Sequence, residues 1–208
     1  MKKIALGISN DQAWMHQGFF YNFNALIKPE YCMIVEGKAR IKVVSLNEII
    51  SKSYKWNADY IFFMDIDHQF EQDTLVKLLK HDKDIVGGLY HLRQPPFSPV
   101  AGWFKDEDVA VNQNKNIWNL NYAKFPFGDK DGLVEVDWTG VGCLLVKMSV
   151  FDKIDWKKKP LVDIWDNERG VRKVGHDVNL CQRAKEIGIK TYIDRTINCG
   201  HLWNFYIG

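Results

Sequence analysis

The chain has 208 residues, of which 46% are hydrophobic and 13% aromatic. A chain of this size and composition can bury one substantial core, so we expect a single folded domain spanning residues 1–208. Lys and Arg total 28 against 26 Asp and Glu, which gives a net charge of +2. That balance lacks the strong basic excess of dedicated nucleic-acid-binding proteins, and no nucleic-acid binding is expected.

Apolar runs in the sequence are short. The longest, such as residues 61–64 and 143–146, fall far below the roughly 20 residues that a transmembrane helix requires. The apolar run behind the basic start at residues 1–3 ends by residue 9, which is too short for the core of a signal peptide. We therefore expect no transmembrane segment and a cytoplasmic location. The four cysteines form no CxxC pair, and we expect them to be reduced.

The first half of the chain alternates predicted strands and helices. Strands are predicted at residues 3–8, 31–35, 58–64 and 85–88, and helices at 12–26, within 41–56 and at 74–80. Asp73 is expected to be the N-cap of the last of these helices. Such alternation predicts an α/β, Rossmann-like fold with a mostly parallel central sheet flanked by helices. Ligands of such sheets bind at the carboxyl ends of the strands.

The second half is less regular. Prolines at 95, 96 and 99 and a polar stretch over 105–116 predict loops and short hairpins. Residues 133–138 and 141–147 are strand-like, and a final helix is predicted from about residue 177 to 187, ended by Gly188. We therefore expect a small additional sheet or hairpin in this half, without a domain boundary.

The first candidate site is Met64-Asp65-Ile66-Asp67-His68. It follows the nearly all-apolar residues 58–64, a pattern typical of a central strand buried on both faces. Asp65 and Asp67 would then lie at the carboxyl edge of the sheet. Neighbouring carboxylates repel unless they are hydrogen-bonded or bridged by a cation, and a divalent ion with oxygen ligands is the usual solution. A solvated turn is the alternative interpretation.

Two further candidates lie near the C-terminal end. Asp177 falls at the start of the final predicted helix, where the helix dipole favours an anion, so it is either a cap or a general base. His201 lies in Cys199-Gly200-His201-Leu202-Trp203 and is either structural or a metal ligand. An imidazole added to carboxylate and phosphate oxygens would favour Mn²⁺ over Mg²⁺.

Taken in order, residues 60–67, 136–146 and 175–201 resemble GT-A fold glycosyltransferases of the family 2-like group. The resemblance implies a metal-dependent enzyme that moves a sugar from a nucleoside-diphosphate sugar, a UDP- or GDP-sugar, to a hydroxyl of a carbohydrate or other acceptor. Mn²⁺ or Mg²⁺ is the implied cofactor. By this resemblance Asp67 binds the metal, Asp65 contacts the nucleotide or the metal through water, and His201 is the third ligand.

The same resemblance assigns the remaining roles. Asp177 would be the general base of an inverting reaction, although the family usually has Glu before this aspartate, where this chain has His176. His176 would itself take the proton or contact the acceptor. Gly7, Ile8 and Ser9, together with Asn47, fall where the family holds the nucleoside. Arg93 would meet the diphosphate or the sugar, unless it forms a surface ion pair.

Two other functions stay open at this point. A nucleotidyltransferase acting on a sugar phosphate would also need carboxylates and a divalent ion, although the chain has no Gly-rich phosphate loop. A catalytically inactive homologue that binds a sugar nucleotide or carbohydrate is compatible with His176. Trp138 and Trp165 are candidates for stacking on a sugar. A lid over the site would come from residues 94–116 or from a second subunit of a homo-oligomer.

Overall fold

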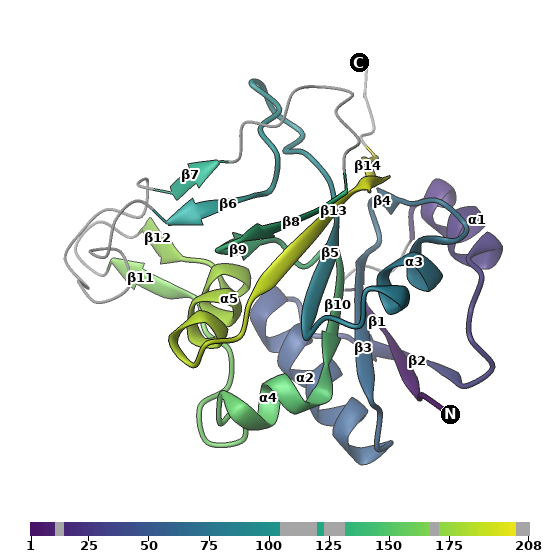
Figure 1. Cartoon of the computed structure of the whole chain (residues 1–208), viewed down its shortest axis with the longest axis horizontal. Coiled ribbons are helices and arrows are strands. Elements are labelled where there is room, and N and C mark those ends of the chain that lie inside the picture. Colours follow the sequence, from purple (N-terminus) through teal and green to yellow (C-terminus); the bar gives the residue numbers. More distant parts are fainter. Residues whose placement is uncertain (11–14, 105–119, 123–131, 167–170, 203–208) are drawn as a thin grey trace.

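The structure is a computed structural model that describes residues 1–10, 15–104, 120–122, 132–166 and 171–202. Its centre is a seven-stranded sheet with the order β2-β1-β3-β10-β5-β13-β8 (Figure 1). Strands β2, β1, β3, β5 and β13 run in one direction, and β10 and β8 run against them. The predicted mostly parallel α/β sheet is confirmed. These strands are β1 (Ile4–Ser9), β2 (Cys32–Gly37), β3 (Tyr60–Asp65), β5 (Ile85–Leu89), β8 (Leu133–Val136), β10 (Cys143–Lys147) and β13 (Thr191–Asn198).

Helices cover both faces of the sheet because side chains alternate between the faces along each strand. On β3, Ile61 and Phe63 belong to a core cluster with residues of α2, α4 and α5. Phe62, the residue between them, belongs to the opposite cluster with residues of α1 and α3. No helix in the described parts of the chain is long and apolar enough to cross a membrane. The helices are α1 (Gln17–Ala25), α2 (Lys42–Lys55), α3 (Thr74–Lys80), α4 (Met148–Lys153) and α5 (His176–Glu186).

The helix ends agree only partly with the sequence-based predictions. Asp73 does occupy the N-cap of α3, but its side chain makes no cap hydrogen bond. Its carboxylate instead pairs with Lys77 one turn later, with Oδ1 and Nζ 3.0 Å apart. The predicted end of the last helix is confirmed within a residue: α5 ends at Glu186, and Gly188 adopts a positive φ of 78°. Glycine reaches that conformation without the steric cost that a side chain adds.

Smaller sheets occupy the second half of the chain, as predicted. Strands β6 (Ala101–Phe104), β7 (Leu120–Tyr122) and β9 (Trp138–Thr139) form one, and β11 (Ile164–Asp166) pairs with β12 (Val171–Val174) in another. A third joins distant segments: β4 (His68–Gln69) pairs with β14 (Gly200–His201), which places His201 opposite His68. Figure 1 shows this two-stranded ribbon beyond the end of β3, so the tail of the described chain returns to the predicted Asp-x-Asp segment.

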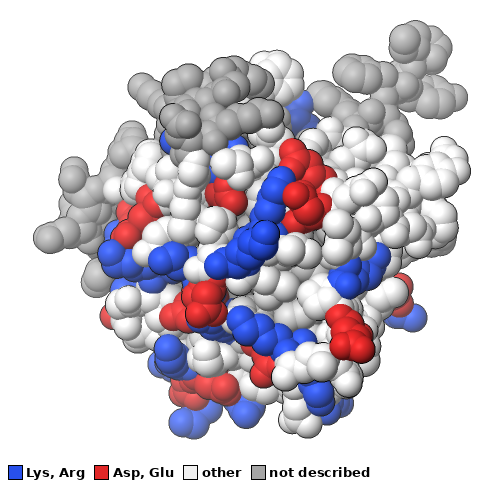
Figure 2. All heavy atoms as spheres, turned by 45° about the vertical axis from the view of Figure 1, so that its right-hand side comes forward, with Lys and Arg blue, Asp and Glu red and all other residues white. Residues whose placement is uncertain are grey.

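Charged side chains are mixed on the surface. Figure 2 shows Lys and Arg interspersed with Asp and Glu over the described part of one face. This arrangement agrees with the small net charge of +2. Function is therefore better indicated by individual ion pairs than by a large patch of one charge on this face.

Candidate functional site

The end of strand β3 presents the two aspartates. Asp65 is the last residue of β3, and its backbone N–H donates to the carbonyl of Gly142 at 3.1 Å. The carbonyl of Asp67 accepts a hydrogen bond from the N–H of Leu202 at 2.7 Å. The turn that carries both carboxylates is thus hydrogen-bonded to the residue before β10 on one side and to the residue after β14 on the other. This is the carboxyl edge of the parallel strands, as the sequence predicts.

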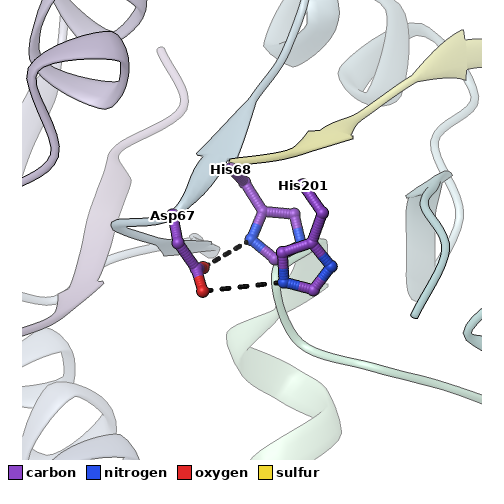
Figure 3. A group of neighbouring side chains, drawn as sticks. All are labelled: Asp67, His68 and His201. Atoms are coloured by element: carbon purple, nitrogen blue, oxygen red, sulfur yellow. Dashed lines mark hydrogen bonds and ion pairs between the residues drawn. The ribbon is translucent and has the colours of Figure 1, made fainter. Parts of the chain in front are cut away.

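Asp67, His68 and His201 form a compact cluster (Figure 3). One ligand-type atom from each of the three lies within 4.8 Å of the others. Asp67 Oδ1 is 3.0 Å from His68 Nδ1, and Asp67 Oδ2 is 3.6 Å from His201 Nε2. The structure thus brings together Asp67 and His201, which the sequence proposes as metal ligands. It adds His68, which the sequence analysis did not single out although it adjoins Asp67.

His201 is oriented by its second ring nitrogen. His201 Nδ1 lies 2.8 Å from the carbonyl oxygen of His91, so Nδ1 carries the proton it donates and Nε2 faces Asp67. Burial lowers the pKa of His201. The hydrogen bonds with Asp67 and with the His91 carbonyl raise it by more, so the pKa lies above its ordinary value. A carboxylate facing an imidazole whose other nitrogen is hydrogen-bonded to a carbonyl is an arrangement that could hold a divalent metal ion.

Both aspartates carry neighbouring cations. Arg93 Nη1 lies 3.1 Å from Asp67 Oδ2, the same oxygen that faces His201. Burial raises the pKa of Asp67, but hydrogen bonds from His201 and His68 outweigh it and hold the pKa well below its usual range. Lys42, at the start of α2, pairs with Asp65. Burial likewise raises the pKa of Asp65, and Lys42 and then His68 lower it to a net value below the ordinary one. Both carboxylates are therefore ionised at neutral pH.

A cavity of about 330 Å³ is lined by both aspartates, by Lys42 and by the start of α5. Its lining combines three carboxylates with two basic side chains. Most of the residues come from the ends of β1 and β3, the segment at the start of α2 and the start of α5, while Tyr90 follows β5 and Val141 precedes β10. The lining residues are Ser9, Ala39, Arg40, Lys42, Asp65, Ile66, Asp67, Tyr90, Val141, His176 and Asp177. Asp65 and Asp67 thus share one cavity with the predicted base Asp177, whereas His201 is not among the residues that line it.

The start of α5 is fixed by a residue that the sequence analysis missed. Asp163 Oδ1 accepts from the backbone N–H of His176 at 2.8 Å and lies 3.0 Å from His176 Nδ1. Asp177 follows in the first turn of the helix, and its Oδ1 accepts from the N–H of Val178 at 2.9 Å. Asp163 therefore sets the position of His176, which directly precedes Asp177 in the first turn of the helix.

The residues predicted to hold the nucleoside divide into two groups. Ser9 lines the cavity, and its Oγ is 2.8 Å from Ser45 Oγ. Gly7 and Ile8 instead pack inside the sheet: a Cβ on Gly7 would come within 2.8 Å of Ile49, and Ile8 is 3% exposed. The structure gives these two residues packing roles rather than a place in the cavity lining.

Asn47 also makes structural contacts. Its Nδ2 donates to the carbonyl of Leu161 at 2.9 Å, and its Oδ1 accepts from Trp156 Nε1 at 2.8 Å and from the N–H of Leu161 at 3.1 Å. Asn47 therefore fastens the segment after α4 to α2 and is not among the residues that line the cavity. Of the two candidate stacking tryptophans, Trp138 is buried at 2% exposure, whereas Trp165 is 55% exposed.

No family model matches the chain, and no curated protein matches it in sequence. Among solved structures, A197 from STIV is similar with a TM-score of 0.61 and 16% identity, covering 97% of this chain and 86% of that one. GalNAc-T7, solved with UDP, GalNAc and Mn²⁺, is similar with a TM-score of 0.63 and 8% identity. That match covers 99% of this chain but 44% of GalNAc-T7, so this chain spans less than half of it. Identities this low show the fold alone: the chain has a GT-A-like, Rossmann-type fold.

Proposed function

We propose that this protein is a metal-dependent glycosyltransferase that moves a sugar from a nucleoside-diphosphate sugar to an acceptor hydroxyl. The observation that carries the proposal is the meeting of Asp67 and His201 beside a cavity that Asp177 also lines. The GT-A-like fold supports it, because GalNAc-T7, a protein with a similar fold, was solved with UDP, GalNAc and Mn²⁺. UDP- and GDP-sugars are the proposed donors, and a carbohydrate is the leading candidate acceptor.

Asp67 Oδ2 and His201 Nε2 would hold the metal, Mn²⁺ or Mg²⁺. Such an ion would supply positive charge that stabilises the departing nucleoside diphosphate. Lys42 and Arg93 place two further positive charges beside the same carboxylates. They are suited to contact phosphate oxygens, because a diphosphate brings negative charge to a cavity that already contains carboxylates. Asp65 then holds Lys42 in place, and it contacts the nucleotide directly or the metal through water.

Asp177 is the proposed general base. Its carboxylate takes the proton of the acceptor hydroxyl as that oxygen bonds to the anomeric carbon and the bond from this carbon to the phosphate oxygen breaks. Such assistance is typically worth about 10²- to 10⁴-fold in rate. His176, whose ring is held by Asp163, is the second candidate for this proton and otherwise contacts the acceptor. Attack of the acceptor oxygen on the face opposite the leaving group, assisted by this one base, would give inversion at the anomeric carbon.

The identity of the released product tests the reaction class. Wild-type protein is incubated with a panel of UDP- and GDP-sugars and carbohydrate acceptors, with Mn²⁺ or with EDTA. We expect Mn²⁺-dependent release of the nucleoside diphosphate, faster with the correct acceptor. Release of pyrophosphate from a sugar phosphate and a nucleoside triphosphate would indicate a nucleotidyltransferase instead. Donor binding without any turnover across the panel would indicate an inactive binding homologue.

Two variants separate the proposed roles. Asp67→Ala should abolish the Mn²⁺-dependent part of donor binding, since it removes the carboxylate of the metal site. Asp177→Asn should keep donor affinity and lose turnover, because the amide cannot accept the acceptor proton. Lys77→Ala is a matched control: it removes a side chain that pairs with Glu71 and Asp73 on the α3 side, and it should leave both measurements unchanged. Equal donor affinity of wild type and Asp67→Ala in Mn²⁺ would refute the metal site.

A further inference from the structure

His68 is unusually buried for a histidine beside two carboxylates. Its exposure is 1%, and its ring lies edge to face against Tyr90, with centroids 4.5 Å apart. The ring of His201 lies on another side at 4.3 Å (Figure 3). Gly142 closes a further side, where an added Cβ would come within 2.7 Å of His68 Nε2. The imidazole thus fills a close-fitting space that depends on the absence of a side chain at Gly142.

One hydrogen bond identifies the ring nitrogen of His68 that acts as a donor. Nδ1 lies 3.0 Å from Asp67 Oδ1, and an ionised carboxylate can only accept, so Nδ1 carries the hydrogen. Nε2 is buried and has no hydrogen-bond partner within the described residues. Nδ1 is therefore the ring nitrogen that donates a hydrogen bond to Asp67.

We propose that His68 is a positioning residue for Asp67. Its Nδ1–H holds Oδ1, so that the carboxylate presents Oδ2 toward His201 Nε2 as a single-oxygen metal ligand. The pairing of β4 with β14 sets His68 opposite His201, so one ribbon aligns the carboxylate and the imidazole together. This role rests on the proposed metal-dependent function. In it, His68 acts through Asp67 and does not itself bind the ion.

Two substitutions at this position separate positioning from direct ligation. In His68→Asn the amide nitrogen takes nearly the place of Nδ1 and can still donate to Asp67, whereas His68→Leu fills the space without a donor. Mn²⁺ affinity is measured by electron paramagnetic resonance, with Mn²⁺ alone and with Mn²⁺ plus UDP, on variants whose circular dichroism and Tm confirm folding. We expect His68→Leu to lose about 10- to 100-fold in Mn²⁺ affinity, as outer-shell changes do, and His68→Asn to recover most of it.

Gly142→Ala tests the same role without altering His68. The added methyl group would displace the His68 ring and weaken Mn²⁺ binding in the wild-type background. It should have little effect in the His68→Asn background, where the smaller side chain leaves room. The double-mutant cycle therefore gives a coupling between the two positions. Equal losses from Gly142→Ala in both backgrounds would overturn the proposal.

Several results decide against the role. Unchanged Mn²⁺ affinity in folded His68→Leu would make the residue a packing group, and equal weakness of His68→Asn and His68→Leu would make the imidazole itself a ligand. In ¹⁵N NMR of the metal-free protein, a His68 signal without a hydrogen on Nδ1 would contradict the hydrogen bond to Asp67. If wild type binds Mn²⁺ but no sugar nucleotide, the proposed function fails while the Mn²⁺ titrations still decide the role of His68. If wild type binds Mn²⁺ neither alone nor with UDP, both the proposed function and the role of His68 are overturned.

Discussion

Removal of the guanidinium next to Asp67 should raise the affinity for Mn²⁺ alone. Arg93 Nη1 lies 3.1 Å from Asp67 Oδ2, the oxygen that would bind the metal. A metal–oxygen distance of about 2.2 Å places a divalent ion roughly 5 Å from this nitrogen. The repulsion between the ion and the guanidinium is then about 1.5 kcal/mol at the dielectric constant of water. That dielectric constant applies because the Arg93 side chain is 46% exposed. Arg93→Met should therefore bind Mn²⁺ alone up to about tenfold more tightly.

The same variant should respond oppositely to the donor. With UDP present, the diphosphate supplies the negative charge that the guanidinium would meet, so Arg93→Met should weaken UDP binding in saturating Mn²⁺. Isothermal titration with Mn²⁺, and separately with UDP in excess Mn²⁺, measures the two effects. Lys77→Met, which removes one positive charge on the α3 side, controls for net charge. Weaker binding of Mn²⁺ alone by Arg93→Met would refute the reasoning, because it would make Arg93 a support of the metal site rather than its competitor.

Three further predictions follow from the structure. Asp177→Asn should lower kcat by about 10²- to 10⁴-fold at unchanged donor affinity. A variant with unchanged kcat and a raised KM would argue against a general base. Because the pKa of metal-free His201 is raised, protons compete with Mn²⁺, so Mn²⁺ affinity measured by titration between pH 6 and pH 8.5 should rise with pH; a flat profile would exclude His201 as a ligand. Asp194, 4% exposed and 2.7 Å from His81, has a lowered pKa: burial raises it, but hydrogen bonds from Thr196 and His81 lower it more. Its stabilisation is present above the unfolded pKa of about 3.9 and is lost as pH falls through the lower folded pKa. Asp194→Asn should therefore cost about 1–3 kcal/mol in urea unfolding at pH 7 and progressively less as the pH falls below about 3.9; a cost that stays the same at low pH would contradict this account.

The parts of the fold that the sequence predicts well depend on local patterns. Residues 58–64 are apolar enough to identify a central strand, and the parallel α/β arrangement then places Asp65 and Asp67 at its carboxyl edge. The end of α5 follows from Gly188, whose positive φ is cheap for glycine. These features need no knowledge of distant contacts, because the chemistry of each segment determines them.

The missed features depend on contacts between distant segments. Charged residues interrupt the apolar pattern of β13 (Thr191–Asn198), so the sequence predicts no strand there. Asp194 in this strand is nevertheless buried, and it pairs with His81 at the end of α3. Asn47 resembles a nucleoside contact by position, but its amide is used to hold Leu161 and Trp156. No local pattern reveals either partnership.

The candidate site shows the same division. The sequence proposes Asp67 and His201, but their meeting depends on the β4–β14 ribbon, which joins residues far apart in the chain. Lys42 and Asp163 carry no local signal, because a lysine at a helix start and an aspartate in a loop are ordinary surface residues. His68 did have a signal, since it directly follows Asp67 and a histidine there can hydrogen-bond its neighbour.

The location of a bound ion tests the central claim most directly. Crystals of the protein grown with Mn²⁺ and UDP should show an anomalous manganese peak between Asp67 Oδ2 and His201 Nε2, at about 2.0–2.3 Å from each. His68 Nδ1 should remain hydrogen-bonded to Asp67 Oδ1, and the UDP phosphates should reach the ion from the cavity. A manganese peak elsewhere, or an Asp67–His201 pair that stays without a metal at saturating Mn²⁺ and UDP, would contradict the account.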